Sequence, residues 1–111
     1  MKKPAARSTA AQSPATRAVE RLAKLAMAGT PALRMVSAMQ GTLADWRRED
    51  LPPGELRDRM ETLLADLDLG IAAAEDYVGE ADTEKGRAAA QGQVDALQAT
   101  REALAAEIEG L

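Results

Sequence analysis

Large apolar residues recur at intervals of three and four residues along most of this chain, which is the spacing of one face of an α-helix. Segments with this period cover residues 14–28, 31–48, 55–78 and 83–109. No segment shows the alternation of apolar and polar residues that is typical of a half-buried strand. The pattern therefore predicts an all-α helical bundle with two shorter helices followed by two longer ones.

Capping residues predict where the two shorter helices begin and end. Ser13 supplies a side-chain oxygen at the N-cap and Pro14 fits the first helical turn, whereas Gly29 is suited to a C-terminal cap. Thr30 and Pro31 repeat the same start signal for the second helix. The residues expected to be buried in the first helix are Ala18, Val19, Leu22, Leu25 and Ala26. In the second they are Val36, Met39, Leu43 and Trp46, with Leu33 and Met35 at the edges.

The Leu51–Gly54 segment contains Pro52 and Pro53, which end the second helix because proline has no N–H to donate. In the next two helices the apolar positions alternate between spacings of four and three, as in a coiled coil. A polar loop at 79–82, with Asp82 or Thr83 as the following N-cap, joins them into an antiparallel αα-hairpin over residues 55–111. The predicted seam consists of Leu56, Met60, Leu63, Leu67, Gly70, Ala74 and Tyr77 on one side and Ala90, Val94, Leu97, Arg101, Leu104, Ile108 and Leu111 on the other.

Two details of this seam carry separate expectations. The small residues Gly70, Ala74 and Ala90 would let the two backbones approach closely near the loop. Arg101 interrupts the apolar stripe, and its stem is expected to pack while its head reaches Glu61 or Asp68. Alternatively, Arg101 is a polar residue that fixes the register of the hairpin or the oligomeric state.

Residues 1–12 are basic and lack the apolar surface that folding needs, so they predict a disordered basic tail before a single helical domain at 13–111. Only 26 of the 111 residues are Leu, Met, Val, Ile, Trp or Tyr, and much of the remaining apolar content is Ala. Since burial free energy scales with apolar area, a monomer would have a thin core. This favours a fold that is completed by another protein or by a second copy.

Charge is segregated along the chain. Residues 1–34 hold seven basic residues and one acidic residue, whereas 51–111 hold five basic and fourteen acidic residues. The basic arm could neutralise nucleic-acid phosphates, although the acidic half would repel DNA. The candidate phosphate contacts are Lys2, Lys3, Arg7, Arg17, Arg21 and Lys24.

The composition argues against most chemistry. The chain has no His and no Cys, so it lacks the commonest general base and the soft metal ligands. An EF-hand frame that starts at Glu80 fails, because Lys85 and Gln91 occupy the positions that require Gly and Glu. We therefore expect no enzyme activity, no metal, no cofactor and no small-molecule substrate. No apolar run is long enough to cross a membrane, and we expect a cytoplasmic protein.

These observations favour a non-enzymatic helical protein-interaction or assembly protein, with a composition typical of a bacterial or phage genome. One alternative is a nucleic-acid-associated phage or plasmid protein that uses its N-terminal arm. Another is an acidic helical inhibitor that mimics nucleic acid and binds a basic partner. Met and Trp suit an adaptable interface, and Leu69 points away from the predicted seam. The predicted interface residues are Met35, Met39, Leu43, Trp46 and Leu69.

Overall fold

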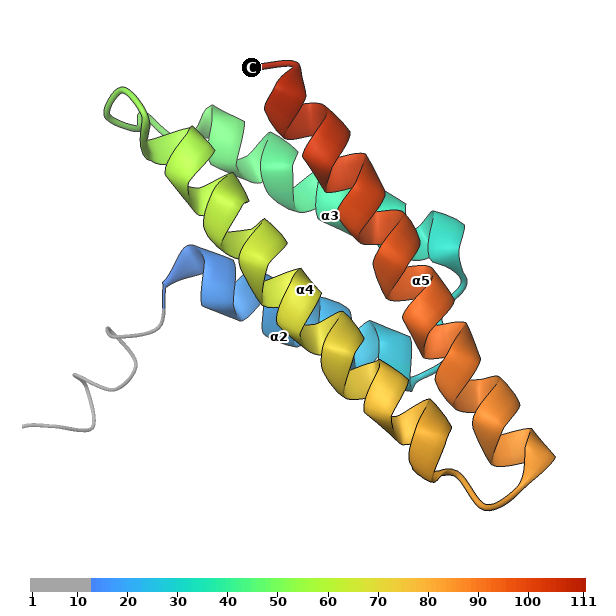
Figure 1. Ribbon diagram of the computed structural model, residues 1–111. Helices are drawn as coiled ribbons and strands as arrows, with labels where there is room; N and C mark the ends of the chain where they lie inside the picture. Colours follow the sequence, from blue (N-terminus) through green and yellow to red (C-terminus); the bar gives the residue numbers. More distant parts are fainter. Residues whose placement is uncertain (1–12) are drawn as a thin grey trace, which may run out of the picture.

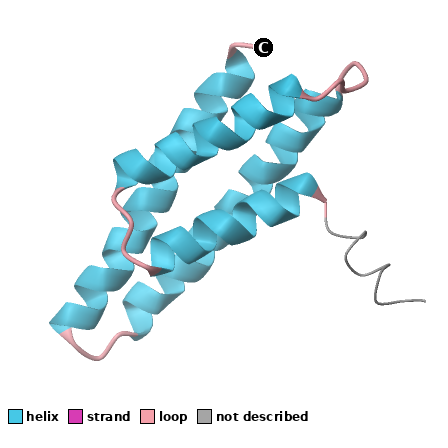
Figure 2. Cartoon of the chain, turned by 180° about the vertical axis from the view of Figure 1, so that it is seen from behind, coloured by secondary structure: helices cyan, strands magenta, loops and turns pink. Residues whose placement is uncertain are grey.

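A computed structural model describes residues 13–111, and the predicted tail at 1–12, with Lys2, Lys3 and Arg7, lies outside the described residues. The helices are α2 (Pro14–Met27), α3 (Ala32–Arg48), α4 (Glu55–Glu80) and α5 (Glu84–Glu109). No strand is present in the part of the chain that the structure describes (Figure 2). The prediction of an all-α fold is confirmed.

The four helices within residues 13–111 form two layers (Figure 1). The long helices α4 and α5 run antiparallel and make the most extensive helix–helix contact, while α2 packs mainly on α4 and α3 packs mainly on α5. The molecule measures 47 × 42 × 18 Å, and the short dimension fits two layers of helices. The ends of α4 and α5 that meet at residues 81–83 project beyond α2 and α3 (Figures 1 and 2).

The start and end of α2 follow the predicted caps. The Ser13 hydroxyl oxygen accepts a hydrogen bond of 3.0 Å from the Thr16 N–H, and Gly29 adopts the left-handed conformation with φ of 81°. The prediction that Thr30 caps α3 is wrong, because Pro31 occupies the N-cap position and no side chain caps this helix. The Thr30 N–H instead donates to the Leu25 carbonyl at 3.0 Å, so this residue closes α2 rather than opening α3.

The loop before α5 is shorter than predicted, because α4 continues to Glu80. Of the two residues considered for the N-cap of α5, Thr83 occupies it, and its hydroxyl oxygen accepts a hydrogen bond of 2.9 Å from the Gly86 N–H. At the other end of the hairpin, Gly54 has φ of 87° and turns the chain into α4 without a side-chain cap.

All four helices contribute to one cluster of buried apolar residues. Met35, expected at the edge of its stripe, is fully buried, because α3 packs on α5 through the face that joins Met35 to Met39 and Leu43. Tyr77, expected on the seam, is 64% exposed near the C-terminal end of α4, where it lies beside the end of α2. The largest fully buried apolar side chains are Leu22, Met35, Met39, Leu43, Met60, Leu63, Leu67 and Leu104.

The buried face of α5 is wider than its apolar pattern indicated. Ala96 and Thr100 are buried in addition to the predicted stripe, because α5 is covered by α3 as well as by α4. The Thr100 hydroxyl satisfies its own donor by bonding the Ala96 carbonyl at 2.8 Å. The expected close approach at Gly70 is wrong, because a Cβ added there would meet no heavy atom within 4 Å.

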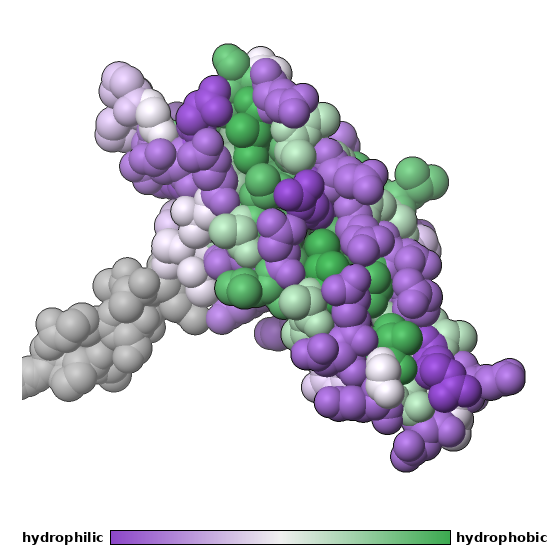
Figure 3. Space-filling view, viewed as in Figure 1, coloured by the Kyte–Doolittle hydropathy of each residue, from purple (hydrophilic) through white to green (hydrophobic). Residues whose placement is uncertain are grey.

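Figure 3 shows the outer face of the α4–α5 layer. Hydrophilic residues cover most of this face, and apolar residues gather in a band along the line between the two helices. Among the residues beside this line, Arg101 donates to Asp68 at 2.9 Å. The predicted partnership of Arg101 with Glu61 or Asp68 is thus confirmed for Asp68.

Candidate functional site

The residues of α3 that were predicted as an interface lie in the core of the chain itself. Met35, Met39 and Leu43 are fully buried, and Trp46 is 5% exposed. The prediction that these four side chains meet a partner is therefore wrong for the folded chain, because α3 uses its single large apolar face to pack on α5. Leu69 is different, since it is 70% exposed on α4.

The described members of the basic arm lie on the surface of α2. Arg17, Arg21 and Lys24 are exposed and follow one another at spacings of four and three residues, so they share one face of the helix. This face points away from the buried residues Leu22 and Ala26. The structure therefore brings three of the six predicted phosphate contacts together.

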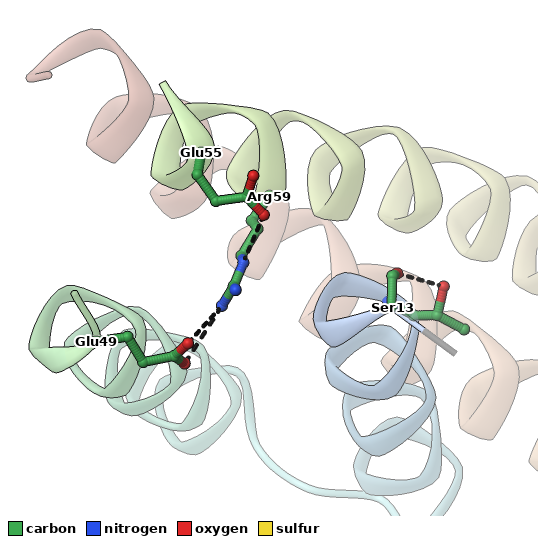
Figure 4. A network of polar contacts seen from close by, with 5 residues as sticks. Ser13, Glu49, Glu55 and Arg59 are labelled. Atoms are coloured by element: carbon green, nitrogen blue, oxygen red, sulfur yellow. Dashed lines mark hydrogen bonds and ion pairs between the residues drawn. The ribbon is translucent and has the colours of Figure 1, made fainter. Parts of the chain in front are cut away.

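The densest polar cluster surrounds Arg59 at the start of α4 (Figure 4). Its guanidinium group donates to the carboxylates of Glu49 and Glu55, each at 3.3 Å, and lies over the Trp46 ring. These charges satisfy one another, and the cluster contains no side chain that could act as an activated nucleophile. Its geometry is that of a structural clamp between the end of α3 and the beginning of α4.

Two further findings concern metal ligands and membrane spans in residues 13–111. No group of three or more acidic side chains lies close enough together to hold a metal ion within this range. None of the four described helices combines the length and the apolar character that a membrane span requires.

The most prominent concave surface lies where the end of α2 meets the projecting half of the hairpin. Three adjoining hollows of about 340, 470 and 170 Å³ occupy this region. Met27 of α2 and Gln93 of α5 line all three hollows, and Tyr77 of α4 lines two of them. We refer to this continuous surface as the Met27–Tyr77 groove.

Two large apolar side chains mark the groove, and small residues form much of the remaining surface. Met27 is 72% exposed and Tyr77 is 64% exposed, which leaves most of their surface in water. Ala23, Ala73 and Ala89 are among the small residues that line the hollows. A concave surface with exposed apolar side chains is typical of a site that another molecule covers.

The sequence prediction missed this groove. Met27 is a large apolar residue whose helical position lies outside the apolar stripe of α2, and this is a signal that sequence reasoning could have used. Tyr77 was assigned to the seam because its spacing fits, yet its side chain is turned toward α2 and solvent. Leu69, the one exposed residue of the predicted interface, lines none of these hollows.

No protein-family model matches this chain, and comparisons with curated proteins and with solved structures give no significant match either.

Proposed function

We propose that this chain is a non-enzymatic protein-interaction or assembly protein and that the Met27–Tyr77 groove is its binding surface. The observation that carries this proposal is the position of Met27 and Tyr77. Both large apolar side chains border one concave surface at the place where the hairpin extends beyond the second layer of helices. Complete burial of each side chain would contribute about 1.5–3 kcal/mol to association, before the cost of ordering the partner.

The shape of the groove suits a helical partner. Ala and Gly residues keep the groove wall low, so the backbone of an incoming helix could lie close to α2 and α4. The four-and-three spacing of α4 and α5 would extend a coiled-coil-like packing to this additional helix. In this proposal the projecting hairpin is a rigid arm that presents the groove. A cytoplasmic location and a bacterial or phage origin stay predictions from composition.

The experiment is site-specific photo-crosslinking of the full chain in cells of its source. A photoreactive phenylalanine analogue replaces Tyr77 in one variant and Leu33 in the control, because Leu33 is 85% exposed and lies outside the groove. We expect a discrete protein adduct from position 77 that is lost when Met27→Glu is added. Equal adducts from positions 77 and 33, or adducts that persist with Met27→Glu, would contradict the proposal.

The face formed by Arg17, Arg21 and Lys24 supports nucleic-acid binding as a second candidate function. Arg21 and Lys24 on this face could neutralise about two phosphates, and such binding weakens as salt is raised. Fluorescence anisotropy of labelled duplex DNA with the full chain tests this function. We expect the Arg21→Glu, Lys24→Glu double variant to weaken binding, and an unchanged affinity would exclude a role for this face.

A further inference from the structure

We infer that the occupant of the Met27–Tyr77 groove is a basic amphipathic helix from another protein. This inference rests on the proposed function and adds the chemistry of the partner. It follows from the charges that surround the groove.

The groove lies beside a strongly acidic stretch of α4. Residues 60–80 contain six carboxylates and no Lys or Arg. Two of the six are neutralised within the described chain, since Glu61 pairs with Arg57 at 3.7 Å and Asp68 pairs with Arg101 at 2.9 Å. The four that form no ion pair with a described residue are Asp66, Glu75, Asp76 and Glu80.

One of these four carboxylates lines the groove. Glu80 lines the same hollow as Met27 and Tyr77. On the α5 side, Asp95 lines the hollow beside Met27, where its carboxylate accepts a hydrogen bond from Gln91 and forms no ion pair. An occupant with Lys or Arg along the edges of its apolar face would therefore meet opposite charge at Glu80 and at Asp95, although Arg87 also lies near Glu80, where it donates to the Ala81 carbonyl.

A second copy of this chain fits the groove less well. A groove-to-groove contact would place Glu80 and Asp95 of one copy against the same carboxylates of the other. The exposed large apolar side chain nearest to the basic face of α2 is Met27, three residues after Lys24, and it already borders the groove of its own copy. Charge complementarity thus favours a partner helix that carries both basic residues and large apolar side chains.

The test is a selection from a displayed library of random 18-residue peptides against the immobilised full chain at physiological salt. A parallel selection uses the Met27→Glu, Tyr77→Glu variant, and Leu33→Glu is the matched surface control. We expect peptides enriched only on the wild type and the control to carry apolar residues at i, i+4 and i+7 with a net positive charge. Thermal unfolding followed by circular dichroism establishes that every variant is folded.

Enriched peptides are then synthesised and their affinities are measured by fluorescence anisotropy. We expect Glu80→Lys with Asp95→Lys to weaken binding about fivefold at low salt and less at 0.5 M NaCl, because salt screens exposed charges. Groove-dependent peptides that are neutral or acidic would overturn the basic partner and leave the proposed function intact. If no peptide depends on Met27 and Tyr77, the proposed function fails as well. Self-association that disappears with Met27→Glu would instead assign the groove to a second copy.

Discussion

The guanidinium carbon of Arg59 lies 5.7 Å from the centroid of the Trp46 ring. The side chain of Arg59 is only 14% exposed, and the same guanidinium group pairs with Glu49 and Glu55. One cation therefore connects the end of α3, the turn that follows it and the first turn of α4. Arg59 lies near the start of α4 (Figure 4), whereas Tyr77 of the Met27–Tyr77 groove lies near the end of the same helix.

We expect Arg59→Ala to lower the free energy of unfolding by about 1–2 kcal/mol, because it removes a cation–π contact and two partly buried ion pairs. Urea unfolding followed by Trp46 fluorescence measures this change. Arg57→Ala is the matched control, since Arg57 is 48% exposed and pairs only with Glu61, and it should cost at most about 0.5 kcal/mol. Equal losses in the two variants would show that the clamp contributes nothing specific.

The same substitution at a buried and at an exposed position of α4 compares how much each contributes to the free energy of unfolding. Leu63 is fully buried and Leu69 is 70% exposed on the same helix. We expect Leu63→Ala to cost about 2–5 kcal/mol through lost burial and a residual cavity, and Leu69→Ala to cost at most about 0.5 kcal/mol. Thermal and urea unfolding of both variants provide the measurement. A large loss at Leu69 would mean that this residue is covered in solution.

The helices could be predicted because their signals are local. Ser13 and Gly29 bound α2 through caps that depend only on neighbouring residues, and the three-to-four-residue spacing identified most of the buried face of each helix. The pattern predicted that Met39 and Trp46 are covered, but it could not tell whether the chain itself or a partner covers them. An apolar helix face has the same period in both cases, and the structure buries both residues within the chain.

The groove depends on tertiary relationships that no local pattern contains. Tyr77 has the spacing of a seam residue, yet it lies beside Met27 of α2 and most of its surface stays exposed. Met27 and Gln93 come together only after α2 packs against the hairpin. How far one layer of helices extends beyond the other depends on the helix lengths and on where the turns place the helices. The spacing of apolar residues along the chain does not predict these positions.

Gly41 and Gly54 should respond oppositely to substitution by Ala. Gly41 lies inside α3 with open space where a Cβ would be, so Gly41→Ala should stabilise the chain by about 0.5–1 kcal/mol. Gly54 has φ of 87°, which strains any L-residue with a side chain, so Gly54→Ala should destabilise by about 1 kcal/mol. Melting temperatures of the two variants test this difference, and a shift in the same direction for both would contradict it.

The N-cap of α5 should show coupling between Thr83 and Gly86. A Cβ added at Gly86 would lie 3.0 Å from the Thr83 hydroxyl oxygen, which accepts the Gly86 N–H. We expect Thr83→Ala alone to cost about 1 kcal/mol. Gly86→Ala should stabilise by about 1 kcal/mol only in the Thr83→Ala background, where no hydroxyl has to move. A double-mutant cycle of unfolding free energies measures the coupling, and strict additivity would exclude it.

Two interpretations of Arg101 can be tested through its pair with Asp68. In the first, the stem of Arg101 packs and its head reaches water; in the second, Arg101 fixes the pairing of α4 with α5. The N–O distance of the pair is 2.9 Å, but the two side chains are 39% and 51% exposed, so water and salt screen the interaction. We expect Arg101→Met to change the free energy of unfolding by at most about 0.5 kcal/mol, because the Met stem can replace the packing of the Arg stem. Urea unfolding at low and high salt, with sedimentation to measure the oligomeric state, tests this expectation. A loss above about 1.5 kcal/mol, or an altered oligomeric state, would show instead that Arg101 fixes the register of the hairpin.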